Sequence, residues 1–252
     1  MLRTERHARI LERVSAQGSV SVEELSVLLA VSGATVRRDL QHLDEVNLLH
    51  RTHGGAAVGN IGLETPMLYR GERRRPEKRA IALAAAALVP ANAVVGMTGG
   101  STATEIARIL AERGPVTIVT NAVNIAAELI LHKDVTLVVI GGTARNESYE
   151  LVGPIAEKTL ADYHTDVMFL GVDGISAAHG CTTHDQLEAA TDRAFTDRSS
   201  HTVVVADHSK IGRVTLAKIC PLSHIGHLVT DRDAPEGELA RIAAAGVSVS
   251  VV

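Results

Sequence analysis

A stretch rich in glycine and hydroxyl residues, Thr98-Gly99-Gly100-Ser101-Thr102, stands between an apolar run and a segment with helical spacing. Gly99 and Gly100 allow backbone N–H groups to approach an anion closely, and the hydroxyls of Ser101 and Thr102 add two donors. The positive end of the helix dipole favours negative charge at the same place. The stretch therefore predicts a phosphate-binding turn, although many glycine-rich turns between a strand and a helix only form a corner.

Other short apolar runs in the C-terminal part of the chain also end in polar or glycine residues. In a parallel sheet the carboxyl ends of the strands meet at one edge, which is where ligands bind. Each of these endings taken alone could be a simple turn, and a surface position is the plainer interpretation of a lone lysine. Together they predict a ligand-binding rim made of Thr120, Asn121, Gly141, Asp173 and Lys210.

The apolar runs that lead to these endings predict the strands of the sheet. They are rich in β-branched residues and alternate with stretches of helical spacing, which is typical of an α/β fold with a mostly parallel sheet. Hydrophobic residues make up 46% of the 252 residues and aromatic residues only 2%. The core must then consist of Ala, Val, Leu and Ile, which suits a buried parallel sheet. The runs lie at residues 93–97, 116–120, 135–140, 167–172, 202–207, 227–231 and 247–252.

The first 53 residues have a different pattern, of short amphipathic segments separated by turn signals. Ser21 has the spacing of a capping box with an acidic residue three positions later, which predicts a helix start. Leu25, Leu28 and Leu29 form an apolar stripe on the helix that follows. A tight turn then leads to a further helical segment, "GATVRRDLQHLDEV". This order predicts a helix-turn-helix with its core at residues 20–39.

The last of these helical segments predicts the recognition helix. On a wheel of about 100° per residue, Val36, Leu40 and Leu43 form the buried face, whereas Arg38 and Gln41 point outward. In the major groove of DNA, arginine pairs with guanine and glutamine with adenine. The outward face therefore predicts direct contact with base edges.

The DNA contacts are expected on this helix and on a short extended run after it, which predicts a wing. We assign them to Ser32, Thr35, Arg37, Arg38, Gln41, Arg51 and His53. Residues 1–60 carry seven basic and seven acidic residues, so a three-helix dimerisation module is the alternative interpretation. The concentration of arginines on one helix face favours DNA binding.

Composition limits the remaining functions. The net charge is −4, so any contact with nucleic acid must come from a local patch. Two cysteines provide no disulfide framework, and no signal peptide or membrane span is expected, so a cytoplasmic location is predicted. His179, Cys181 and His184 are capable of metal binding but fit no standard zinc spacing. We predict neither a metal nor a cofactor, and Cys220 is expected to be a small buried hydrophobic residue.

The tracts "VSGATVRRDLQHL" and "RTHGGA" resemble the winged helix-turn-helix of the DeoR family of bacterial transcription regulators. The pattern "TGGST…GVDG…HGCTTHDQLEAA…ADHSK" resembles the sensor domain of that family, whose fold is shared with ribose-5-phosphate isomerase, glucosamine-6-phosphate isomerase and the CoA transferases. The resemblance implies a DNA-binding domain at 3–58, a linker at 59–74 and a sensor domain at 75–232. Residues 233–252 would add a helix and a strand packed on the sensor domain.

The resemblance also implies roles for the rim residues. Asp173 would accept hydrogen bonds from sugar hydroxyls, and Lys210 would pair with the phosphate or with a sugar oxygen. Glu188 stands where the related isomerases have their general base, although a solvated helix residue is the plainer interpretation. The phosphate would be bound by Gly100, Ser101 and Thr102, with Gly99 as part of the turn and Thr120 and Asn121 on the same rim. The family usually has Asp where Thr98 stands and Gly where Ala30 stands.

These features predict a transcription regulator, a repressor of carbohydrate-metabolism genes. Its binding to double-stranded operator DNA would be controlled by a phosphorylated sugar. The alternative is an enzyme resembling the sugar-phosphate isomerases, with an accessory DNA-binding module. The N-terminal segment favours the regulator, because an isomerase does not need outward-facing Arg38 and Gln41. Since one winged domain reads only a short half-site, a homo-oligomer, either a dimer or a tetramer, is expected.

Overall fold

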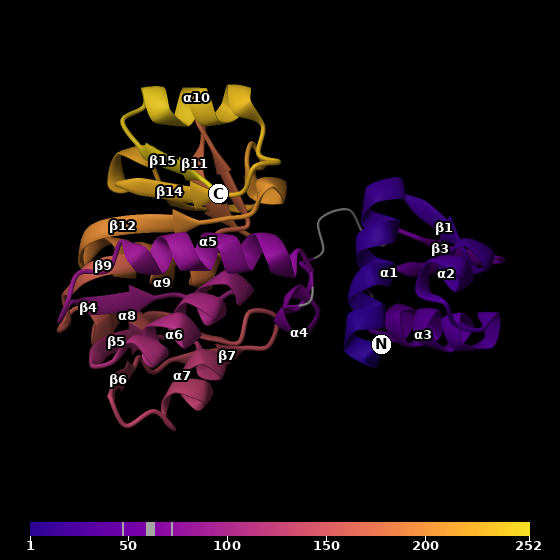
Figure 1. Cartoon of the computed structure of the whole chain (residues 1–252), viewed down its shortest axis with the longest axis horizontal. Coiled ribbons are helices and arrows are strands. Elements are labelled where there is room, and N and C mark those ends of the chain that lie inside the picture. The colour runs from indigo at the N-terminus through magenta and orange to yellow at the C-terminus, as the bar shows by residue number, and fades with distance from the viewer. Residues whose placement is uncertain (47, 59–63, 72) are drawn as a thin grey trace. The chain divides into compact units, whose positions relative to one another are not determined.

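A helical part and an α/β part follow one another along the chain, and the computed structural model describes residues 1–46, 48–58, 64–71 and 73–252. The two compact units are Met1–Arg73 and Arg74–Val252, called here the N-terminal unit and the C-terminal unit (Figure 1). Part of the predicted linker, residues 59–63 and 72, lies outside the described residues. Among the described residues, no helix is long and apolar enough to cross a membrane.

The N-terminal unit contains four helices and a small antiparallel sheet in its described part, with strand order β1-β3-β2. The hydrophobic core gathers Ile10, Leu25, Val36, Leu40 and Leu43, which come from the three longer helices and are at most 1% exposed. The elements are α1 Arg3–Gln17, β1 Ser19–Ser21, α2 Val22–Leu29, α3 Gly33–Glu45, β2 His50–Thr52, β3 Gly55–Ala57 and α4 Met67–Arg70. Helix α4 lies within the predicted linker and packs against α1.

Local signals set the ends of α2 and α3. Ser21 and Glu24 form the predicted capping box, in which each side chain bonds the backbone of the other. Ala30 ends α2 in the left-handed conformation, with φ of 52°, which explains why glycine suits this position. Ser32 caps α3 by accepting a hydrogen bond from the Thr35 N–H at 3.3 Å. The prediction for Leu28 is wrong: it is 46% exposed, because only the i, i+4 leucines of this short helix face the core.

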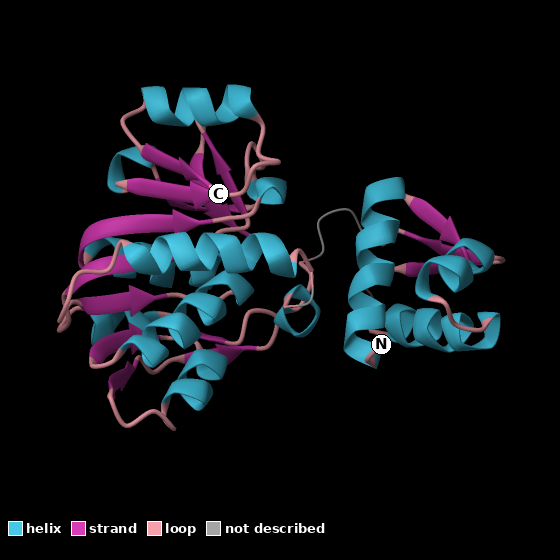
Figure 2. Ribbon diagram, viewed as in Figure 1, coloured by secondary structure: helices cyan, strands magenta, loops and turns pink. Residues whose placement is uncertain are grey.

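The C-terminal unit is built on a seven-stranded, wholly parallel sheet with strand order β15-β14-β12-β9-β4-β5-β6. Each of its strands overlaps one of the predicted apolar runs, so the α/β prediction is confirmed (Figure 2). The strands are β4 Val94–Met97, β5 Val116–Thr120, β6 Val135–Val139, β9 Thr165–Leu170, β12 Ser199–Val205, β14 His227–Thr230 and β15 Ser248–Val251.

Helices cover both faces of this sheet, and alternate strand residues point to opposite cores. Val167 and Phe169 of β9 pack with residues of α5, α6 and α7, whereas Met168 and Leu170 pack with residues of α8, α9 and α10. Figure 1 shows α5 and α6 in front of the strands. The helices are α5 Arg75–Ala87, α6 Ser101–Arg113, α7 Val123–Leu129, α8 Pro154–Leu160, α9 Gln186–Asp197 and α10 Glu236–Ala244.

Smaller elements extend the carboxyl edge of the sheet. They are the hairpin of β7 Thr143–Arg145 with β8 Glu150–Val152, and an antiparallel sheet of β10 Gly174–Ser176, β11 Gly180–Thr183 and β13 Ala217–Cys220, with the short helices η1 His208–Lys210 and η2 Leu222–His224.

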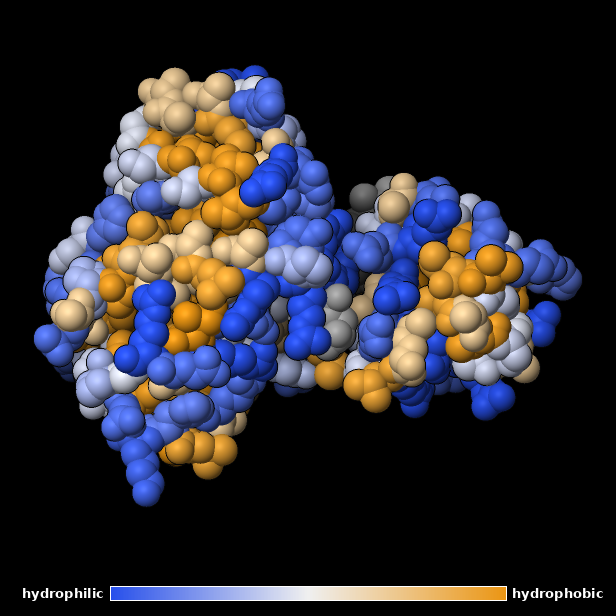
Figure 3. Space-filling view, viewed as in Figure 1, coloured by the Kyte–Doolittle hydropathy of each residue, from blue (hydrophilic) through white to orange (hydrophobic). Residues whose placement is uncertain are grey.

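The outer surface of the large helices is mixed: Leu83 of α5 is 50% exposed, and polar and apolar residues lie side by side on the face in Figure 3.

Candidate functional site

Helix α3 presents the predicted recognition face. Val36, Leu40 and Leu43 are buried as predicted, whereas Arg37, Arg38 and Gln41 are exposed. The Gln41 amide donates a hydrogen bond to Glu45 Oε1 at 3.0 Å along the helix. Ser32 is exposed and Thr35 half-buried at the helix start, where their hydroxyls lie 3.0 Å apart. The outward surface of the helix thus carries guanidinium, amide and hydroxyl groups, which can bond base edges and phosphates.

Asp39, on the inner side of α3, is held by α1. Arg6 donates to its carboxylate from Nε at 2.5 Å and from Nη2 at 2.9 Å, and His7 Nε2 lies 3.0 Å from Asp39 Oδ1. Burial raises the Asp39 pKa, but the hydrogen bonds from Arg6 and His7 outweigh it, so the pKa is lowered. Burial lowers the pKa of His7, against the opposing effect of Asp39. This network fixes the orientation of α3, the predicted recognition helix, and no local pattern in the sequence marks it.

The predicted wing is the β2–β3 hairpin. Arg51 in β2 and His53 in the turn are exposed, and the Arg51 N–H donates to Asp44 Oδ1 of α3 at 3.1 Å. Gly55 is required by space, because a Cβ there would lie 1.9 Å from the carbonyl oxygen of Val20 in β1. The wing is therefore anchored both to the recognition helix and to the small sheet.

In the C-terminal unit, the predicted phosphate-binding turn joins β4 to α6. Gly100 precedes α6 with a φ of 118°, a conformation that glycine adopts readily. Thr98 is buried, and its hydroxyl accepts a hydrogen bond from the Gly171 N–H at 3.0 Å. Ser101 is half-buried and Thr102 buried in the first helical turn, where backbone N–H groups have no partner within the helix. The turn thus has the donors that an anion needs.

Glu150, for which the sequence has no local signal, lies against this turn. Its Oε1 accepts a hydrogen bond from the Gly99 N–H at 2.5 Å. A Cβ on Gly99 would lie 2.6 Å from Glu150 Cγ, so only glycine fits at this approach. Glu150 is the first residue of β8 and is 3% exposed.

Thr120 and Asn121 lie beside the glycine turn, because Thr120 is the register partner of Met97 at the ends of β5 and β4. Both are fully buried. The Asn121 amide donates to the Leu151 carbonyl at 3.2 Å, while its Oδ1 has no hydrogen-bond partner among the described residues. Gly141, half-buried, follows the next strand, β6. The structure places all three at the predicted carboxyl edge.

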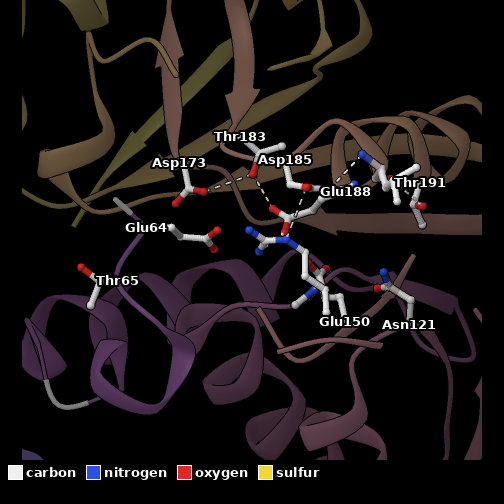
Figure 4. Close-up of polar contacts among 12 residues, drawn as sticks. Glu64, Thr65, Asn121, Glu150, Asp173, Thr183, Asp185, Glu188 and Thr191 are labelled. Carbon is white, nitrogen blue, oxygen red and sulfur yellow. Dashed lines mark hydrogen bonds and ion pairs between the residues drawn. The ribbon is translucent and has the colours of Figure 1, made fainter. Parts of the chain in front are cut away.

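Asp173 and Glu188 belong to one polar network with Thr183 (Figure 4), and Lys210 joins it through Asp173. Lys210 Nζ lies 2.9 Å from Asp173 Oδ1. Lys210 is therefore part of an ion pair with a buried acid and not a solvated surface lysine. The Thr183 hydroxyl contacts both Asp173 Oδ2, at 3.1 Å, and Glu188 Oε1. Arg145 donates to Glu188 Oε2 at 3.0 Å. Glu188 is 6% exposed, so the alternative of a solvated helix residue is wrong.

A further acid lies under this network. Asp192, one helical turn after Glu188 on α9, is 2% exposed, and its Oδ1 has no hydrogen-bond partner among the described residues. Burial raises its pKa strongly, and the negative charges of Glu150, Glu188 and Asp173 raise it further. The carboxyl is thereby driven toward its neutral form.

Cationic side chains gather around Asp207, which follows β12 at the same edge of the sheet. Burial raises the Asp207 pKa, but the hydrogen bond from Ser209 and the charges of Arg74, Lys78 and Lys210 outweigh it, so the pKa is lowered. Lys78 is 6% exposed; in the sequence it is indistinguishable from the solvated charges of an amphipathic helix. The rim therefore combines backbone donors with three cations.

Arg74 also contacts the loop that carries Lys210. Its Nε lies 3.3 Å from His208 Nε2 and 3.9 Å from Asp207 Oδ1. His208 Nδ1 in turn lies 2.8 Å from Asp231 Oδ1. His208, Asp231 and Asp233 come close enough together to ligate an ion, but the guanidinium against His208 opposes a cation there. Cys181 and Cys220, both buried, are register partners in β11 and β13.

Comparison with known proteins matches both units. The model of the DeoR-like helix-turn-helix domain matches residues 6–61, and that of the DeoR C terminal sensor domain matches residues 73–232. The glycerol-3-phosphate regulon repressor of Escherichia coli (strain K12) is 34% identical over 235 residues, 93% of this chain and 93% of that protein. The HTH-type transcriptional regulator GlpR of Haloferax volcanii is 36% identical over 250 residues, 99% of this chain and 98% of that protein.

Among solved structures, ribose 5-phosphate isomerase A from Methanocaldococcus jannaschii aligns with a TM-score of 0.36 and 20% identity, covering 55% of this chain and 53% of that one. That score is too low to carry an argument. The family to which the chain belongs is shown instead by the two family matches and by the relatives that cover more than 90% of the chain.

Proposed function

The chain belongs to the DeoR family of DNA-binding transcription regulators, and we propose that a phosphorylated sugar bound at the rim of its C-terminal unit controls its binding to operator DNA. Relatives that cover 90–99% of the chain are named as repressors or transcriptional regulators. The chain is therefore a transcriptional repressor and not an isomerase. We call the units the DNA-binding unit and the sensor unit from here on.

The observation that carries the choice of ligand is the charge of the sensor rim. The charges of Arg74, Lys78 and Lys210 lower the pKa of Asp207 at the carboxyl edge of the sheet, and the glycine turn before α6 lies at the same edge. Cations and helix N–H groups together are the donors that bind a phosphate. Asp173, an acceptor held by Lys210, suits the hydroxyls of a sugar. A relative is named for the glycerol-3-phosphate regulon, which is consistent with a phosphorylated ligand.

For the DNA-binding unit, we propose contacts through Ser32, Thr35, Arg37, Arg38 and Gln41 of the recognition helix and through Arg51 and His53 of the wing. Exposure of the arginines and of Gln41 supports this assignment. Two copies would read two half-sites, so we propose a dimer or a tetramer that works on DNA in the cytoplasm. The domain limits 3–58, 75–232 and 233–252 remain part of this proposal.

The experiment is a mobility-shift titration on operator DNA selected from genomic fragments. Pentose and hexose phosphates are compared with the same sugars without phosphate, at fixed salt. We expect at least one sugar phosphate to change the affinity for DNA. At 100 times its dissociation constant, the same ligand should raise the free energy of unfolding by about 2.7 kcal/mol. Lys78→Met should lose the response, while Lys133→Met, at an exposed lysine before β6, should keep it. A response to neutral sugars alone would contradict the phosphate assignment.

A further inference from the structure

The glycine turn of the sensor unit already holds an anion, the carboxylate of Glu150. Glu150 Oε1 accepts the Gly99 N–H at 2.5 Å, and the Glu150 side chain lies directly over Gly99. With 3% of the residue exposed, the contact is shielded from water. One of the donors that would otherwise face a ligand phosphate is therefore engaged by the chain itself.

The backbone holds Glu150 in this position. Glu150 forms an antiparallel bridge with Ala122, two residues after the end of β5, and the Leu151 N–H donates to the Asn121 carbonyl at 2.8 Å. The preceding residue, Tyr149, has a left-handed φ of 62°, a conformation that persists only where the surroundings enforce it. The negative charge is thus placed at the turn by the β7–β8 hairpin.

A second acceptor lies next to it. Asn121 is fully buried, and its Oδ1 has no hydrogen-bond partner among the described residues. Asn121 and Glu150 lie near one another in Figure 4, and two hydrogen bonds between Asn121 and Leu151 join their segments. A buried oxygen without a donor is costly, so this corner of the rim favours a ligand that brings hydrogen-bond donors.

We propose that Glu150 is a specificity-determining residue of the effector site: it excludes a phosphate from the Gly99 N–H and selects a ligand that presents a hydroxyl or an amino group there. The phosphate then lies against the remaining N–H groups of α6 and the cations of the rim. Like charges placed side by side repel strongly in a buried site. The Glu150 carboxylate alone is therefore enough to decide which end of the ligand lies at the Gly99 N–H. The inference rests on the proposed function, because it takes the rim to be the effector site.

The test compares the full-length chain with Glu150→Gln, Glu150→Ala and the control Glu147→Gln, by calorimetric titration with inorganic phosphate and with ribose 5-phosphate. Glutamine keeps an acceptor for the Gly99 N–H but removes the charge. Glu147 is exposed in the same hairpin, so its substitution controls for net charge. Thermal melting checks that each variant is folded, and the alanine variant provides a second measurement if the glutamine variant is unstable.

The expected result is that both Glu150 variants bind inorganic phosphate about tenfold more tightly than the parent, because a like charge has been removed. Their preference for ribose 5-phosphate over phosphate should fall, and Glu147→Gln should match the parent. Unchanged or weaker phosphate binding in both Glu150 variants, with binding by the parent, overturns this inference alone. Absence of phosphate and ribose 5-phosphate binding in all four chains overturns it together with the assignment of the rim as a phosphate site.

Discussion

The guanidinium of Arg6 donates two hydrogen bonds, of 2.5 Å and 2.9 Å, to the carboxylate of Asp39. The pair joins the first helix to the buried side of the recognition helix. The outward residues of α3 are therefore presented by a helix whose rotation is fixed by an ion pair as well as by apolar packing.

Removal of Arg6 should loosen the recognition helix. In Arg6→Met, Asp39 stays buried without its guanidinium, which should destabilise the DNA-binding unit by about 3 kcal/mol. Hydrogen exchange of the α3 amides in the full chain measures this loss. Arg9→Met is the control, since Arg9 is 51% exposed and paired with Glu5 on the same helix, and it should cost less than about 0.5 kcal/mol. Parent-like protection of α3 in Arg6→Met would disprove a structural role for the pair.

The same network predicts a dependence on pH. The folded chain lowers the His7 pKa, so the unfolded chain takes up a proton first and stability falls as the pH drops below about 6.5. The Asp39 pKa is also lowered, so its contribution is present above the unfolded value of about 3.9 and is lost as the pH falls through the folded value. Exchange of the α1 and α3 amides from pH 8 downward follows both steps. His7→Asn should remove the first step and leave the second.

Arg38 and Arg51 should differ in their effect on DNA recognition. Arg38→Ala should cost about 1–3 kcal/mol of affinity for the operator and relax specificity at one base position. Arg51→Ala should weaken binding to all sequences alike and reduce the salt slope by about 1. Mobility-shift titrations on operator and scrambled DNA at several salt concentrations separate the two. Unchanged operator affinity in Arg38→Ala would remove this residue from the interface.

A new carboxylate at the start of α6 should block the effector. Ser101→Asp adds a negative charge that the helix dipole tolerates but that repels a phosphate at the same N–H groups. The variant should bind operator DNA normally and fail to respond to the sugar phosphate identified for the parent. Ser101→Asn, of equal size and without charge, should retain most of the response. A normal response of Ser101→Asp would exclude the start of α6 from the phosphate site.

Features that depend on neighbours in sequence were predictable. The capping box of Ser21 and the cap of Ser32 involve residues three positions apart, and the apolar runs lie on the strands because a parallel sheet buries both faces. Ala30 keeps the left-handed turn although it is not glycine. Of the predicted stripe, Leu25 and Leu29 are buried and only Leu28 is exposed, because residues four positions apart share the face of this short helix that packs on the core.

Features that depend on distant residues were not predictable. Arg6 and Asp39 are 33 residues apart, and Gly99 and Glu150 are 51 apart. Lys78 and Asp39 have the polarity of a solvated helix face, and only the packed fold shows that they are buried. Glu188 and Lys210 were recognisable because their segments resemble a family pattern, whereas their shared network with Thr183 and Arg145 became visible only in the structure.

Arg74 is the first residue of the sensor unit, and its guanidinium lies 3.3 Å from the ring of His208. The loop that begins at Asp207 also carries Lys210, whose amine contacts Asp173. The Arg74 side chain therefore connects the start of the sensor unit to the loop that we propose to face the ligand. A displacement of that loop therefore changes the contacts of Arg74, the residue with which the sensor unit begins.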